Sequence, residues 1–173
     1  MRPNLMRLLV LLTAGTVVAV SACRTEAGVS GRESRAAGDS SFAGVQRRGA
    51  VVMGVNQYTS RHVFEPLADG GRIELQRSVD DSVGVAQIRR HMQLIARQFA
   101  AGDFRLPGMV HAREVPGTRV MADHRPVISY TVESLPRGGA VRVRSTDTVA
   151  VRAIHDFLAF QRQDHHASAR HDS

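Results

Sequence analysis

The chain has 173 residues, a length typical of about one domain. Apolar residues make up 43% of it, enough for one packed core and too few for a bundle of membrane helices. The formal charge is +7, but the arginines are scattered among acidic residues, a pattern that predicts a solubilising surface and no nucleic-acid partner. The single cysteine excludes an intramolecular disulfide, so the fold must depend on its core.

Residues 1–22 have the three parts of a secretory signal peptide. Arg2 and Arg7 give a positive beginning, and small residues precede the cysteine. Between them Leu8–Val20 is an uncharged run of 13 residues, whereas a spanning helix needs roughly 20. The pattern therefore predicts export.

The run Val20-Ser21-Ala22-Cys23 resembles the lipobox of bacterial lipoproteins, an aliphatic residue and two small ones before a cysteine. The resemblance implies that Cys23 becomes the N-terminus, carries fatty acyl groups such as palmitate and tethers the chain to a membrane of the cell envelope. An uncleaved anchor and an ordinary signal peptide with a chance cysteine are the alternatives to a lipoprotein signal. Arg24 stands where an Asp often signals inner-membrane retention. The periplasmic face of the outer membrane is therefore favoured if the cell is Gram-negative.

Residues 23–48 are rich in Gly, Ser, Ala, Arg and Glu and have almost no aliphatic periodicity. Such a segment buries too little apolar surface to offset its ordering entropy. We expect a flexible tether after the acylated cysteine. Phe42 and Val45 are its candidates for docking on the domain.

Residues 49–164 are expected to fold, and their first half predicts three strands and a helix. The strands are expected at Val51–Tyr58, around His62–Glu65 and at Arg72–Arg77, with a glycine turn before the last. Residues 80–82 can cap the helix, which Gly102 ends. Its apolar stripe at helical spacing is Val85, Ile88, Met92, Ile95 and Phe99.

The second half repeats this pattern after residues 104–116, which predict a loop or linker with at most a short strand. Strands are expected at Val127–Val132 and Ala140–Arg144. Residues 146–147 can cap a last helix, with its inner side at Val151, Ile154, Phe157, Leu158 and Gln161. Residues 165–173 predict a disordered polar tail.

A shift of 68 residues aligns the two halves with each other, and a slip of two residues aligns their helices. The matched pairs include Gly70-Gly71 with Gly138-Gly139, and Met92 with Leu158. We therefore predict an α+β fold, a single small domain of two repeated strand-hairpin-helix units. Its sheet is expected to be mostly antiparallel, with both amphipathic helices on one face. Open edges of that sheet would allow a homodimer.

No catalytic or phosphate-binding motif is present, which makes an enzyme the least favoured hypothesis. Among eight histidines, His91, His111 and His155 are the candidates for copper, zinc or haem iron outside the cytoplasm. Their spacing fixes no ligand set, and ordinary half-buried or loop histidines are the alternative. Glu65 and Glu133 occupy equivalent repeat positions and could form a carboxylate pair, or each could contact a turn or an arginine such as Arg72.

The sequence thus favours a membrane-tethered lipoprotein that binds an envelope protein or a small ligand. A periplasmic metal or haem binder is the alternative, and no cofactor is firmly implied.

Overall fold

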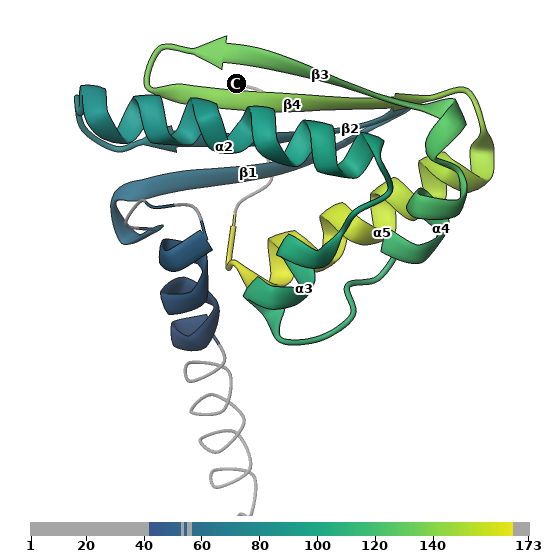
Figure 1. The fold of residues 1–173 in the computed structure, drawn as a ribbon, viewed down its shortest axis with the longest axis horizontal. Helices are drawn as coiled ribbons and strands as arrows, with labels where there is room; N and C mark the ends of the chain where they lie inside the picture. The colour runs from purple at the N-terminus through teal and green to yellow at the C-terminus, as the bar shows by residue number, and fades with distance from the viewer. Residues whose placement is uncertain (1–41, 53, 55–56, 168–173) are drawn as a thin grey trace, which may run out of the picture.

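The computed structural model describes residues 42–52, 54 and 57–167. In chain order its elements are a helix at 42–52, η1 (Gln57–Thr59), β1 (Ser60–Leu67), β2 (Gly70–Arg77), α2 (Ser82–Ala100), α3 (Arg105–His111), α4 (Thr118–Asp123), η2 (Arg125–Val127), β3 (Ile128–Leu135), β4 (Gly138–Ser145) and α5 (Thr148–Asp164). The strands form one antiparallel sheet in the order β1-β2-β4-β3, and α2 and α5 pack against it (Figure 1). The predicted α+β fold is confirmed.

The duplication extends to the bounds of the elements. A shift of 68 residues places η1, β1 and β2 on η2, β3 and β4, and a shift of 66 places the beginning of α2 on that of α5. In the centre of the sheet Ile73 lies opposite Val141, its own repeat equivalent. The β2–β4 pairing therefore relates the two units by a local twofold axis.

The two long helices, α2 and α5, each begin at an aspartate that caps the helix, and these two aspartates are repeat equivalents. The side chain of Asp81 accepts a hydrogen bond of 3.0 Å from the Gly84 amide, and that of Asp147 accepts one of 2.8 Å from Ala150. Each carboxylate satisfies a backbone N–H that has no partner within the helix. The residues predicted to cap the two helices, 80–82 and 146–147, thus include the two aspartates that cap them.

Each helix packs on the other unit's hairpin. Helix α2 lies mainly over β3 and β4, and α5 mainly over β1 and β2. Glycine makes both approaches close: Met92 of α2 lies over Gly139, and Leu158 of α5 lies over Gly71. Because each unit covers the other's sheet, the two share one core and neither can bury its apolar face alone.

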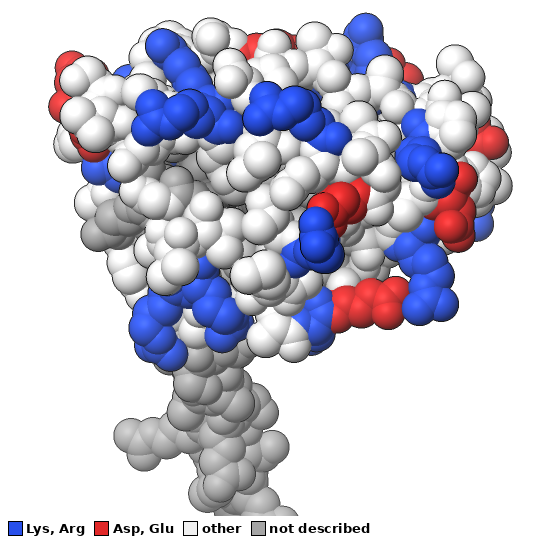
Figure 2. All heavy atoms as spheres, in the orientation of Figure 1, with Lys and Arg blue, Asp and Glu red and all other residues white. Residues whose placement is uncertain are grey.

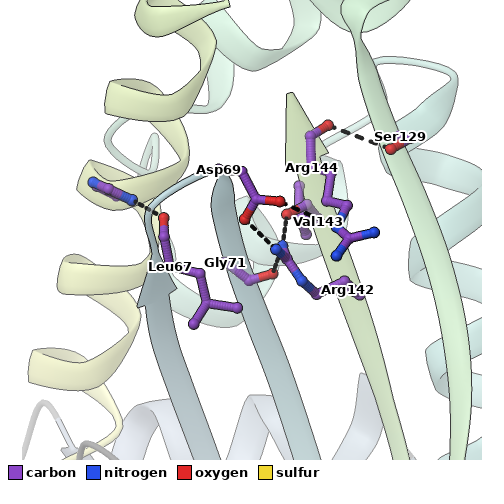
Figure 3. A network of polar contacts seen from close by, with 8 residues as sticks. Leu67, Asp69, Gly71, Ser129, Arg142, Val143 and Arg144 are labelled. Atoms are coloured by element: carbon purple, nitrogen blue, oxygen red, sulfur yellow. Dashed lines mark hydrogen bonds and ion pairs between the residues drawn. The ribbon is translucent and has the colours of Figure 1, made fainter. Parts of the chain in front are cut away.

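The other face of the sheet carries charged side chains that also connect the units (Figure 3). Asp69, in the turn between β1 and β2, accepts from Arg142 and lies 3.2 Å from the Arg144 guanidinium, both on β4. Arg142 also donates to the Gly71 carbonyl at 3.0 Å. Glu133 forms an ion pair with Arg72, as one of its two alternatives predicted.

Basic side chains on the face in Figure 2 form several separate groups, some of them beside acidic side chains. The scattering of arginines among acidic residues along the sequence predicts such a mixed arrangement, and the described residues have it. Among the same residues, no helix combines the length and the hydropathy that a membrane span requires.

Two predictions about residues 42–58 are wrong. Residues 42–52 are helical, so a flexible tether up to residue 48 does not describe them. The strand predicted at Val51–Tyr58 is wrong at 51–52, which are helical, and at 57–58, which belong to η1, whereas 53, 55 and 56 lie outside the described residues. Tertiary contacts explain the helix: Val45 is buried, and Arg48 Nε donates to the Val110 carbonyl at 2.6 Å. Such contacts override weak local propensity. The remainder of the predicted tether, 23–41, lies outside the described residues.

The prediction of a loop at 104–116 is also wrong, because α3 occupies 105–111. Pro107 lies in its first turn, where a helix does not need the missing N–H. Phe104 anchors the beginning of α3 by stacking on Phe99 at 4.5 Å between ring centroids. At the end, Ala112 is left-handed and its N–H donates to the Gly108 carbonyl.

The close approach of helix to sheet makes a matched pair of variants informative. A Cβ at Gly71 would overlap the Leu158 methyl and lie 2.9 Å from the Glu65 carbonyl oxygen, whereas one at Gly139 would lie 3.3 Å from both of its nearest atoms. We expect Gly71→Ala to lower the free energy of unfolding by about 2 kcal/mol and Gly139→Ala by clearly less. Urea unfolding measures both, and equal losses would contradict the packing described.

Candidate functional site

A cavity of about 70 Å³ lies in the core between the sheet and helices α2, α3 and α5. Apolar side chains form most of its wall: Val52, Phe64, Ile73, Met92, Ile95, Phe99, Leu106, Pro107, Val110 and Phe157. The helix at 42–52 thus contributes Val52 to the cavity wall, and α3 contributes several residues. Neither element belongs to the repeated strands and long helices.

Gln161 of α5 and four histidines complete the wall, and the histidines come one each from β1, α2, α3 and the residue after α5. They are His62, His91, His111 and His165. His165 stacks on His62 with 4.9 Å between ring centroids and lies edge-on to His111 at 5.1 Å. Residues from distant parts of the chain therefore form one imidazole-rich wall.

Burial keeps three of these imidazoles neutral. It lowers the pKa of His91 to about 4, and burial with the nearby His91 lowers the pKa of His62 to about 4. The pKa of His165 is lowered to about 2, mainly by burial and to a smaller extent by the nearby His62 and His111. At neutral pH the wall therefore offers uncharged nitrogens that can each donate or accept one hydrogen bond.

His111 is held by hydrogen bonds on both ring nitrogens. Nδ1 lies 2.5 Å from Asp164 Oδ2, and Nε2 lies 3.0 Å from Gln161 Oε1. Arg113 donates to the other oxygen of Asp164 at 3.0 Å and lies over the Phe160 ring. Because both nitrogens are engaged, His111 supports the cavity wall and has no nitrogen left for a ligand.

His165 has the opposite character. It is 9% exposed, and its Nδ1 is buried with no hydrogen-bond partner among the described residues. Leaving a buried polar atom unpaired costs about 1–3 kcal/mol. An unpaired buried atom in a native structure calls for an explanation, and a hydrogen-bonding occupant of the adjoining space is one such explanation.

A second, more polar pocket of about 320 Å³ shares His62 and His165 with the cavity. Its other lining residues are Phe42, Gln46, Tyr58, Ser60, Arg61, His166 and Ala167. Gln46 Oε1 is buried and also lacks a partner among the described residues. The two stacked histidines therefore line both an apolar space and a polar one, and His165 and Gln46 each carry an unpaired polar atom.

The duplication shows that the fold does not require these histidines. The repeat equivalents of His62, His91 and His165 are Tyr130, Phe157 and Phe99, which pack as an aromatic cluster with centroids 5.8 and 6.0 Å from the Phe99 ring. The stack of His62 on His165 thus corresponds to the contact of Tyr130 with Phe99. One copy of these three positions is an aromatic cluster in which the buried Tyr130 hydroxyl has no partner among the described residues, and the other copy consists of histidines. Phe99 and Phe157 line the same cavity as the histidines.

The predicted site residues are only partly brought together. His91 and His111 line the cavity, but His155 lies elsewhere, with Nε2 2.9 Å from the Leu67 carbonyl oxygen. In the part of the chain that the structure describes, no group of three His, Cys, Asp or Glu is arranged to hold a metal ion. Cys23 lies outside the described residues.

His62 and His165 were missed as site residues. Strand alternation places His62 on the same face as Phe64, a signal in the sequence that favours the core. His165 was assigned to a polar tail, a prediction that is wrong for residues 165–167. The C-cap at His165 and the hydrogen bond from its N–H to the Gln161 carbonyl hold it against the core. Residues 168–173 lie outside the described residues.

Comparison of the chain with protein-family models, curated proteins and solved structures finds no match.

The lowered pKa values predict how stability depends on pH. Above pH 6.5 these histidines are neutral in both the folded and the unfolded chain, so they contribute no pH dependence. As the pH falls from 6.5 towards 4, only the unfolded chain takes up protons, so stability falls. At pH 5 we expect a loss of up to about 2 kcal/mol for each such histidine.

Urea unfolding between pH 7.5 and 5 measures this loss. His91→Leu removes one of the groups and is expected to flatten the curve. A midpoint that is constant over this range, or a curve unchanged by His91→Leu, would contradict the burial of neutral imidazoles.

Proposed function

We propose that this chain is an envelope lipoprotein, anchored through acylated Cys23, whose duplicated domain binds a small ligand in the histidine-lined cavity. The single observation that carries the binding part is the unpaired, buried Nδ1 of His165 at the junction of an apolar cavity and a polar pocket. The signal features of residues 1–23 support the anchor.

The ligand that fits has an apolar body and a polar end. The cavity has a volume of about 70 Å³ and a mostly apolar wall, so it would hold a small apolar group of the ligand. The pocket of about 320 Å³ would hold the polar part of the same ligand. A hydroxyl or amine at the junction can bond with His165 Nδ1, and a donor further out can reach Gln46 Oε1. These are the groups whose satisfaction would stabilise the complex.

A metal or haem binder is the second candidate, and a specific observation favours it. Three neutral imidazoles, His62, His91 and His165, line one cavity, and neutral imidazole is a ligand for copper, zinc and haem iron. The stacked arrangement of His62 and His165 is less suited to a shared metal than to a flat organic group. We therefore rank the small organic ligand first.

The anchor is tested by the mass of the mature chain. We expect an N-terminus at Cys23 that carries acyl groups, and recovery of the protein with membranes after cell lysis. Cys23→Ser is expected to leave the chain unacylated and to release it from the membrane fraction. A mature chain that retains residues 1–22, or an unmodified Cys23, would refute the anchor without affecting the cavity.

The cavity is tested with two probes of similar shape, phenol and benzene, followed through the imidazole NMR signals. Because only phenol has a hydroxyl, one added hydrogen bond is expected to favour it by roughly tenfold. His165→Phe is expected to abolish this preference. His155→Gln, on α5 but outside the cavity lining, is the matched control and should retain it.

The same titration includes copper, zinc and haem. Stoichiometric metal binding that His165→Phe abolishes would replace the small-ligand hypothesis by the second candidate. If neither probe nor metal changes the signals of His62 and His165, the cavity is structural only.

A further inference from the structure

The sheet has two outer edges, β1 and β3, which are repeat equivalents with the same register to their neighbours. In an antiparallel edge strand, alternate residues direct their backbone N–H and C=O away from the sheet. The hydrogen bond from Arg162 to the Phe64 carbonyl shows that Phe64 belongs to this outward set on β1. By the shift of 68 residues, Val132 occupies the same position on β3.

The β1 edge is blocked. Arg162 of α5 donates to the Phe64 carbonyl at 2.9 Å, and Phe64 is only 4% exposed. Two residues further on, Pro66 belongs to the same outward set and has no N–H to offer. A proline and an occupied carbonyl are the means by which natural edge strands avoid pairing with another strand.

The β3 edge lacks both features. Ser134 stands where β1 has Pro66, and Ala96 of α2 stands where α5 has Arg162. No described side chain donates to the Val132 carbonyl, and Val132 is 38% exposed. A groove of about 270 Å³ follows the edge between α2 and β3, lined by Gln93, Ala96, Arg97, Ala100, Tyr130 and Val132. Figure 1 shows β3 as the outermost strand.

We propose that β3 pairs with β3 of a second copy of this chain, antiparallel and about a twofold axis near Val132. The four strands of each copy would then form one eight-stranded sheet. A second copy is the occupant that closes both open edges at once, because the sheet so formed ends in a blocked β1 on each side. A single strand donated by another protein would expose a new edge of its own.

The side chains of β3 are compatible with pairing to themselves. Glu133 is the only charged residue of the strand, and an axis at Val132 places it opposite Thr131 and not opposite its own copy. Glu133 is also neutralised by Arg72 of its own chain. The exposed Val132 side chains would meet at the axis, beside the grooves formed by the small Ala96 and Ala100.

The test introduces at the β3 edge the two features that block the β1 edge. Ala96→Arg with Ser134→Pro gives β3 the arginine and the proline that β1 has at the equivalent positions. The mass of the full chain in detergent micelles is measured by sedimentation. We expect two copies for the natural chain and for the control Pro66→Ser, and one copy for the double variant with unchanged circular dichroism. A monomeric natural chain at tens of micromolar, or a folded double variant that remains dimeric, would overturn the proposal.

A second measurement applies if the double variant does not fold. Val132→Cys in the otherwise natural chain is treated with a short bis-maleimide. We expect a covalent dimer, and none from Val83→Cys, which is exposed near the beginning of α2 and does not line the groove beside β3. Absence of the cross-link at residue 132 would equally overturn the proposal.

Discussion

The hydrogen-bonded pairing of β2 with β4 joins two hairpins that are too small to bury their apolar faces separately. With Ile73 opposite Val141, the two units are related by a twofold axis, and each long helix reaches the hairpin of the other unit. Met92 over Gly139 and Leu158 over Gly71 are the two symmetric contacts that this arrangement places in the core. The shared core and both sheet edges follow from that one pairing, and the helix at 42–52 and α3 add to the wall of the cavity.

Divergence between the two units explains where polar chemistry is found. Phe99, Tyr130 and Phe157 form an aromatic cluster, whereas their equivalents His165, His62 and His91 bring imidazole nitrogens to the cavity that Phe99 and Phe157 also line. A buried neutral imidazole contributes less to stability than a buried aromatic ring of similar size, because its polar atoms must be desolvated. The buried imidazoles lie together around one cavity, which is the reason to associate that cavity with the proposed binding.

The sequence predicted the fold where local patterns and duplication agree, as with the stripe of α2, the glycine turns and the caps Asp81 and Asp147. It failed where tertiary contacts decide the structure. Helix 42–52 depends on Val45 burial and on Arg48 reaching Val110, which no local pattern reveals. Half of the site residues were predicted, since His91 and His111 were named as candidates. The contact of His165 with His62 was not predicted, because the two residues are 103 positions apart and only the fold brings them together.

The most direct test of this account is the register of β2 against β4, observed as cross-strand nuclear Overhauser effects in the isotope-labelled chain. The twofold arrangement predicts contacts centred on Ile73 and Val141, with Leu75 near Gly139 and Gly71 near Val143 on either side. The contacts should lie within one molecule, as shown by samples that mix labelled and unlabelled chains. A shifted register, or contacts found only between molecules, would contradict the shared core and the site derived from it.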